Sequence, residues 1–279
     1  MDVYQFTSLQ RPVNPFVYLT HRLLVLCVPL AGVILGVYTL LTGGDFGSAV
    51  MAGFHAGASA MLAWVLAREI DPDNPYSAFV AIALATLGAF IATPNIWALA
   101  GGVVLLRIVN HIVGYSAKLL DGGVAIGVGM ATMLVTGAWI FGIIVAVAFL
   151  IDALLPDPSP FSWTFLLGSL IITIPVWRYL DVMLIGYPQN WLIVMLVIGA
   201  LFALHIITLQ KFTSVYDVTQ APVMPMRIKA GMALMLMMAV VFGVLYGDSG
   251  VLMLMPLWAV FVGVMVYRVG LIFNRREVR

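Results

Sequence analysis

Apolar stretches of about one membrane thickness follow one another through almost the whole chain. A helix needs about 20 apolar residues to span the hydrocarbon core of a bilayer. Ten stretches approach that length, and they cover residues 23–42, 48–67, 77–92, 95–113, 122–136, 138–155, 162–180, 190–208, 228–246 and 250–273. Glycine, proline and asparagine lie between most of them. This pattern predicts an all-α, polytopic transmembrane bundle of about ten helices, arranged as hairpins.

The composition agrees with a lipid environment. Hydrophobic residues make up 63% of the chain and charged residues 9%, against about 45–50% and about 25% in an ordinary soluble domain. A soluble protein of 279 residues could not cover so much apolar surface. The net charge of +1 gives no electrostatic reason to expect a nucleic-acid partner. We therefore expect one integral membrane domain, residues 1–279, in the cell membrane.

The segment 122–155 decides the number of helices, because it is either one long helix or two short ones broken near Gly137. Short cytoplasmic loops collect Lys and Arg. With two helices, 12 of the 13 Lys and Arg residues fall on the side of the N-terminus, and only Arg178 lies opposite. With one helix the count becomes six against seven, which is no bias. The charges therefore favour ten helices, with both termini in the cytoplasm.

The most acidic interruption of the apolar pattern is "REIDPDNP", residues 68–75, between the second and third stretches. It carries the carboxylates of Glu69, Asp71 and Asp73 within five residues. Three carboxylates so close together could hold Mg²⁺. The alternative is a turn that caps the third helix, because Asp-Pro and Asn-Pro pairs favour turns. The predicted topology puts this segment on the cytoplasmic side.

The fourth stretch ends in a polar stripe on the same predicted side. Arg107, Asn110 and His111 stand at i, i+3 and i+4, which places them on one helical face. Lys118 follows in the next loop. An arginine inside the end of a membrane helix needs an acidic partner or a polar cavity. We therefore expect Arg107 or His111 to lie within hydrogen-bonding or one-water distance of Glu69 or Asp71.

His55 lies inside the second stretch. It stands in "AGFHAGASA" between Gly53 and Gly57, whose small-x-x-x-small spacing permits close helix contact. We expect His55 to hydrogen-bond a neighbouring helix or to line a solute path. Gly123 and Gly127 form a second small-residue face. Such glycine-rich faces also suit homo- or hetero-oligomers.

Two segments resemble a known family of membrane enzymes. "REIDPDNP" and the later "GYSAKLLDGG", residues 114–123, are similar to the acidic motif and the tyrosine-containing basic loop of UbiA-type prenyltransferases. The first segment departs from the family pattern Asn-Asp-x-x-Asp-x-x-x-Asp, and Asp152 and Asp157 are a poor substitute for its second acidic motif. The resemblance implies a lipid-diphosphate transferase, with Mg²⁺ on Glu69, Asp71 and Asp73.

Three functional hypotheses follow, all with the lipid bilayer as a partner. The chain lacks a P-loop, which favours a carrier or channel for a small solute that is not driven by ATP. The side chains expected to line its path are His55, Arg107, Asn110, His111 and Lys118. The first alternative is the lipid transferase, in which Arg107, His111 and Lys118 would receive phosphate oxygens. The second alternative is an accessory subunit of a membrane complex.

Overall fold

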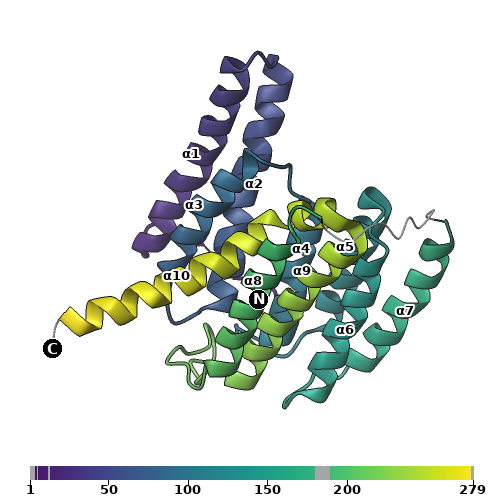
Figure 1. The fold of residues 1–279 in the computed structure, drawn as a ribbon. Coiled ribbons are helices and arrows are strands. Elements are labelled where there is room, and N and C mark those ends of the chain that lie inside the picture. Colours follow the sequence, from purple (N-terminus) through teal and green to yellow (C-terminus); the bar gives the residue numbers. More distant parts are fainter. Residues whose placement is uncertain (1–3, 5, 12, 180–188, 278–279) are drawn as a thin grey trace.

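The described residues form ten helices, as the sequence predicts (Figure 1). The computed structural model describes residues 4, 6–11, 13–179 and 189–277. The helices are α1 (Leu19–Leu41), α2 (Phe46–Ile70), α3 (Ser77–Ala89), α4 (Ile96–Asn110), α5 (Leu119–Thr136), α6 (Ile140–Leu154), α7 (Ser162–Tyr179), α8 (Leu192–Thr208), α9 (Pro225–Met253) and α10 (Met255–Glu277). An isolated antiparallel β-bridge joins Val215 and Pro222 between α8 and α9. The all-α prediction is confirmed for this part of the chain.

Four of these helices are long and apolar enough to cross a membrane. They are α1, α2, α5 and α9, each with at least 18 residues in the described part of the chain. The other six have shorter apolar segments. Buried side chains from across the chain, from Leu24 in α1 to Val264 in α10, belong to one hydrophobic core cluster. The short helices are thus packed into the same body as the long ones.

The segment 122–155 is two helices. Gly137 ends α5 with a left-handed φ of 70°, a conformation that glycine adopts without the steric cost of a Cβ. Three residues later α6 begins at Ile140, and α5 and α6 pack against each other. The two-helix interpretation is therefore confirmed, and with it the order of ten helices on which the charge argument depends.

The boundary between the last two helices differs from the prediction. The expected break at Gly247 is present as a non-helical residue with φ 62° and ψ −145°. Helical structure nevertheless resumes and continues to Met253, so the tenth helix begins at Met255 instead of residue 250. Gly250 permits this kink, because a Cβ there would lie 2.0 Å from the carbonyl oxygen of Phe242.

Contacts between helix ends show that the helices alternate in direction. Glu69 near the end of α2 contacts Arg107 near the end of α4, and Asp152 near the end of α6 contacts Arg227 near the start of α9. We call this end of the bundle the polar end. Every even-numbered helix up to α6 finishes at the polar end. The expected hairpins are present only in part: α1 packs on α2, α5 on α6 and α9 on α10, whereas neither α3 and α4 nor α7 and α8 are packed pairs in the described part of the chain.

The first hairpin projects from the rest of the bundle (Figure 1). Its helices are closest at Gly32 and Gly53: a Cβ on Gly53 would lie 2.8 Å from the carbonyl oxygen of Gly32, and a Cβ on Gly32 would lie 2.9 Å from that of Gly53. Of the two glycines predicted to permit close contact, Gly53 makes it, and Gly57 has ordinary spacing. Most apolar side chains on the outer face of α1 are exposed, among them Leu26 and Leu30.

Alanine at Gly53 should destabilise the protein, and alanine at Gly57 should not. Both substitutions gain the same helix propensity. The new Cβ at position 53 meets a backbone oxygen at 2.8 Å, whereas at position 57 the nearest atom, the oxygen of Val28, lies at an ordinary 3.4 Å. We expect Gly53→Ala to be less stable than Gly57→Ala by about 1–3 kcal/mol, measured by thermal unfolding in detergent. Equal melting temperatures would contradict the tight α1–α2 contact.

Candidate functional site

The carboxylate of Glu69 and the guanidinium of Arg107 form a buried ion pair at the polar end. Arg107 Nε lies 2.9 Å from Glu69 Oε1, and the Glu69 side chain is fully buried. Asn110 Nδ2 donates to the backbone oxygen of Glu69 at 2.9 Å. The predicted contact between Arg107 and Glu69 is confirmed. It forms because α2 and α4 end at the same level of the bundle.

The segment before α1 closes over this pair. Arg107 Nη1 donates a hydrogen bond to the carbonyl oxygen of Leu9 at 2.6 Å. Arg11 lies 3.4 Å from Glu69 Oε1 and 2.7 Å from Asp217 Oδ2. Burial alone would lower the pKa of Arg11, but the charges of Glu69 and Asp217 outweigh it and raise that pKa. Arg11 therefore stays charged and ties the N-terminal segment to both α2 and the loop after α8.

Asp71 and Asp73 bind other parts of the molecule. Arg268 of α10 pairs with Asp71 at 2.7 Å, and Asn74 donates to both carboxylate oxygens of Asp71. Asp73 accepts from Ser214 Oγ at 2.6 Å and from the backbone amides of Thr213 and Ser214. The "REIDPDNP" turn thus connects α2 with α4, α10 and the loop after α8.

This arrangement does not support the Mg²⁺ interpretation. Glu69, Asp71 and Asp73 each turn to a different set of partners. Among the residues that the structure describes, no three His, Cys, Asp or Glu side chains form a group able to hold a metal ion. The three carboxylates are close in sequence, but their side chains point toward different helices and loops.

Alanine at Asp73 should release the loop after α8. Burial alone would raise the pKa of Asp73, but the hydrogen bonds from Ser214 and Thr213 outweigh it and lower that pKa. The carboxylate is therefore charged at neutral pH. Charged hydrogen bonds contribute about 1.5–3 kcal/mol each, so we expect Asp73→Ala to speed tryptic cleavage after Lys211 about tenfold or more.

The matched control is Asp45→Ala. Asp45 also accepts a backbone hydrogen bond, from Ser48 at 2.6 Å, but it caps the opposite end of α2. Cleavage after Lys211 should stay at the wild-type rate in this variant. A similar rate in both variants would mean that Asp73 does not hold the loop.

His111 points away from the Glu69 pair and toward α6. It ends α4 in a left-handed conformation, with φ 51°, and this turns its ring from the face of Arg107. His111 Nε2 lies 3.0 Å from Asp152 Oδ1. Asp152 also accepts from Ser162 Oγ at 2.5 Å and from the Ser159 amide at 3.0 Å. His111 was expected beside Arg107 on one helical stripe, but its ring faces Asp152 of α6 instead.

Arg227 completes this second cluster. Its guanidinium makes five hydrogen bonds: one to Asp152, one to the carbonyl of Val109, two to that of Pro156 and one to that of Asp157. These contacts use the full donor capacity of a guanidinium. Arg227 is 1% exposed. The cluster is a structural clamp between α4, α6 and α9, which sequence reasoning did not identify.

Arg227→Lys should therefore lower the stability of the protein far more than the same substitution at an exposed arginine. Lysine offers three donors from one nitrogen and cannot reproduce the planar fork. Breaking a buried pair costs about 3–5 kcal/mol, and we expect Arg227→Lys to lose stability on that scale in thermal or denaturant unfolding. The control is Arg22→Lys, since Arg22 is exposed and binds the carbonyls of Pro15 and Phe16.

For Arg22→Lys we expect a change within about 0.5 kcal/mol, the usual range for a surface substitution. A loss of similar size in both variants would contradict the clamp.

Lys118 and His55 lie apart from both clusters. The backbone amide of Lys118 donates to Asp121 at 2.8 Å, and its ammonium lies 5.6 Å from the centre of the Tyr115 ring. His55 Nδ1 lies 2.8 Å from the carbonyl oxygen of Met51, in its own helix. The expected hydrogen bond from His55 to a neighbouring helix is therefore not the one observed. The five predicted path residues do not line one cavity, since only Arg107 faces the cavity between α2 and α4.

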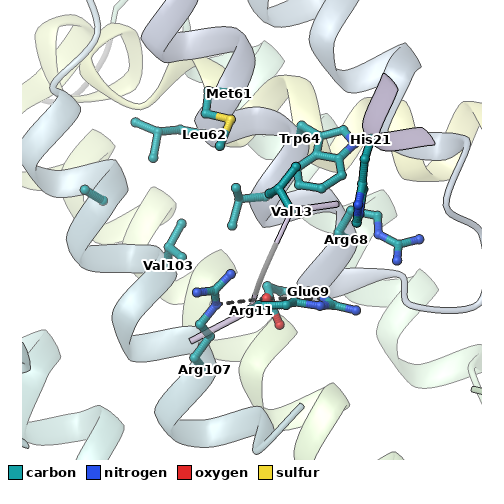
Figure 2. Close-up of a pocket in the computed structure, with 12 residues that line it drawn as sticks. Arg11, Val13, His21, Met61, Leu62, Trp64, Arg68, Glu69, Val103 and Arg107 are labelled. Atoms are coloured by element: carbon teal, nitrogen blue, oxygen red, sulfur yellow. Dashed lines mark hydrogen bonds and ion pairs between the residues drawn. The ribbon is translucent and has the colours of Figure 1, made fainter. Parts of the chain in front are cut away.

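That cavity has a volume of about 280 Å³. Figure 2 shows Arg107, Glu69 and Arg11 near one another, Arg68 beside His21, and Met61, Leu62 and Val103 farther along the two helices. A second cavity of about 320 Å³ lies beside the first and includes Tyr216 and Asp217 of the loop after α8. We call them the inner and the outer cavity.

The two cavities share three lining residues: Arg11, His21 and Arg68. His21 accepts a hydrogen bond from the Asn14 amide at Nδ1, at 2.9 Å. A neutral ring in this arrangement carries its proton on Nε2. The ring packs edge-on against Trp64, with centroids 5.4 Å apart. Two arginines and a histidine donor therefore form the boundary between the cavities.

Known proteins offer no guide to this site, because no family model, curated protein or solved structure matches the chain. The residues around the cavities were largely missed by sequence reasoning, apart from Arg107 and Glu69. Arg11, His21 and Arg68 are far apart in the sequence, and no spacing connects them. The chemistry of the site is that of a partly apolar cavity with several hydrogen-bond donors at one end.

Proposed function

We propose that the protein is a polytopic membrane carrier for a small solute, not driven by ATP, with its polar end and both termini in the cytoplasm. The orientation is supported by the positive charges that gather at the polar end. Those whose side chains the structure describes there include Arg11, Arg68, Arg107, Lys118, Arg227 and Arg268. Arg178, the exception in the charge count, has a side chain outside the described part.

The observation that carries the proposal is the pair of cavities in series. The outer cavity borders the loop after α8, and the inner cavity extends between α2 and α4 toward Met61 and Ala100. Polar groups deep in membrane proteins are costly, and they often mark solute pathways. A carrier needs a site that is reached through a boundary able to open and close, and Arg11, His21 and Arg68 supply such a boundary.

The N-terminal segment is the part of this boundary best suited to move. Its Arg11 makes ion pairs with Glu69 and with Asp217, which lie on different elements. Glu69 keeps Arg107 as a partner at 2.9 Å when Arg11 leaves. Release of Arg11 therefore does not strand a buried carboxylate, which would otherwise oppose the movement.

The two alternatives receive less support. A Mg²⁺-dependent lipid transferase needs several carboxylates to share one cation, whereas Glu69, Asp71 and Asp73 have separate partners. An accessory subunit needs a surface for its partner. The exposed apolar face of α1 offers one, but contact with lipid explains the same face equally well.

Filling the inner cavity should stop uptake by the purified protein. Val103 lines the cavity, and Val103→Phe would narrow it between α2 and α4. Val124 is exposed on α5 outside both cavities, so Val124→Phe is the control of equal size. In proteoliposomes without ATP, labelled phosphate, a short alkyl phosphate and a short carboxylate form the test panel. We expect at least one to enter with wild type and Val124→Phe, and at about a tenth of that rate or less with Val103→Phe.

The variants must first give the same size-exclusion profile and a melting temperature close to that of wild type. Uptake no faster than into empty liposomes for the whole panel would count against a carrier. Equal uptake through Val103→Phe and Val124→Phe would separate transport from the inner cavity.

A further inference from the structure

The inner cavity changes from apolar to cationic along its length. Its wall on α2 is a single stripe, with Met61, Trp64, Val65 and Arg68 at i, i+3, i+4 and i+7. This stripe is about 10 Å long, at 1.5 Å per residue. The apolar positions are farthest from the polar end, and the arginine is nearest to it.

The facing wall on α4 changes in the same direction. Ala100, Val103 and Arg107 stand at i, i+3 and i+7, and α2 and α4 both run toward the polar end. The Glu69–Arg107 pair aligns the two helices. Each wall therefore has its apolar positions and its arginine at matching depths. A ligand that fills this cavity has a polar head at one end and an apolar body at the other.

Arg68 is the one of the three cavity arginines without an ion pair or hydrogen bond in the described part of the chain. Arg107 pairs with Glu69, and Arg11 pairs with Glu69 and Asp217. The three arginines and two carboxylates leave one positive charge uncompensated. Arg68 is only partly exposed, and a guanidinium removed from bulk water needs an anionic partner. This charge matches the head group of a monoanion.

Two further buried atoms on the cavity wall lack partners among the described residues. Trp64 is 6% exposed, and its Nε1 donor has no hydrogen bond. The Oε2 acceptor of Glu69 is also unpaired. A head group that accepts from a guanidinium and an indole, and also donates one O–H, fits these atoms. A phosphate monoester in its singly protonated form has that combination. Its second pKa lies near 6, so this form is the minor one at pH 7 in water, and the free Glu69 oxygen favours it in the cavity by accepting its O–H.

We propose that the inner cavity binds a phosphate monoester that carries an apolar chain. Its head lies at Arg68 and Trp64, and its chain runs along Met61, Leu62 and Val103. This inference rests on the proposed function, because it names the solute class of the same cavity. The volume of about 280 Å³ is just below the usual range for small-molecule sites, so it suits one head group and a short length of a single chain.

Binding of octyl phosphate to the full chain tests the proposal. The protein is placed in nanodiscs of phosphatidylcholine, which present no phosphate monoester, and titrated by calorimetry. We expect saturable binding to wild type and about tenfold or more weaker binding to Arg68→Gln, the loss expected for one charged hydrogen bond. The matched control is Arg22→Gln, which removes an exposed arginine of α1 outside both cavities and should bind like wild type.

Three comparison ligands separate the parts of the proposed ligand. Octanol has the chain without the charge, and inorganic phosphate has the charge without the chain, so both should bind far more weakly than octyl phosphate. Nanodiscs that contain phosphatidic acid supply the same monoester from a lipid. Weaker binding of octyl phosphate there would identify the lipid as the source, and unchanged binding would identify a free solute.

Absence of binding to wild type, equal binding to Arg68→Gln, or equal binding of inorganic phosphate would each overturn the proposal. Its failure can be told apart from that of the carrier function. Binding that depends on Arg68, without uptake of any panel solute, overturns the carrier and keeps the ligand class. Uptake that is blocked by Val103→Phe, without binding of octyl phosphate, overturns the ligand class and keeps the carrier.

Discussion

The ion pair between Glu69 and Arg107 is the contact on which the site depends. A single buried carboxylate among apolar helices would be too costly to keep charged, and the 2.9 Å contact compensates it. The same contact fixes α2 and α4 at a common depth. That register places the apolar residues of both helices at the same distance from the polar end, beyond the arginines. It also lets Arg11 of the N-terminal segment pair with Glu69. The inner cavity is a consequence of this alignment.

Two arginines show how differently the chain uses the same side chain. Arg227 makes five hydrogen bonds and is almost completely buried, so it has no donor left for a ligand. Arg68 faces both cavities and has no ion pair or hydrogen bond among the described residues. In a chain with only 13 basic residues, this contrast separates structural charge from charge that is available to a ligand.

The helices could be predicted from the sequence because the length of an apolar stretch and the charge of a loop are properties of single segments. The same logic predicted the contact between Glu69 and Arg107, since the two helix ends were expected on one side. It failed where side-chain direction depends on tertiary structure. His111 leaves the helical stripe because its φ of 51° ends α4, and Asp71 turns to Arg268 in α10, 197 residues away. Arg68 was visible in the sequence, but its lack of a partner was not.

The glycine contact between α1 and α2 has a mechanical consequence. With backbones in direct contact at Gly32 and Gly53, the first hairpin has no soft layer of side chains there and behaves as a stiff lever. His21 near the start of α1 and Arg68 near the end of α2 sit together at its base. A tilt of this hairpin would carry both residues in the same direction, whereas Arg11 would stay tied to Asp217 in another element. The width of the boundary between the two cavities therefore depends on the angle of the first hairpin.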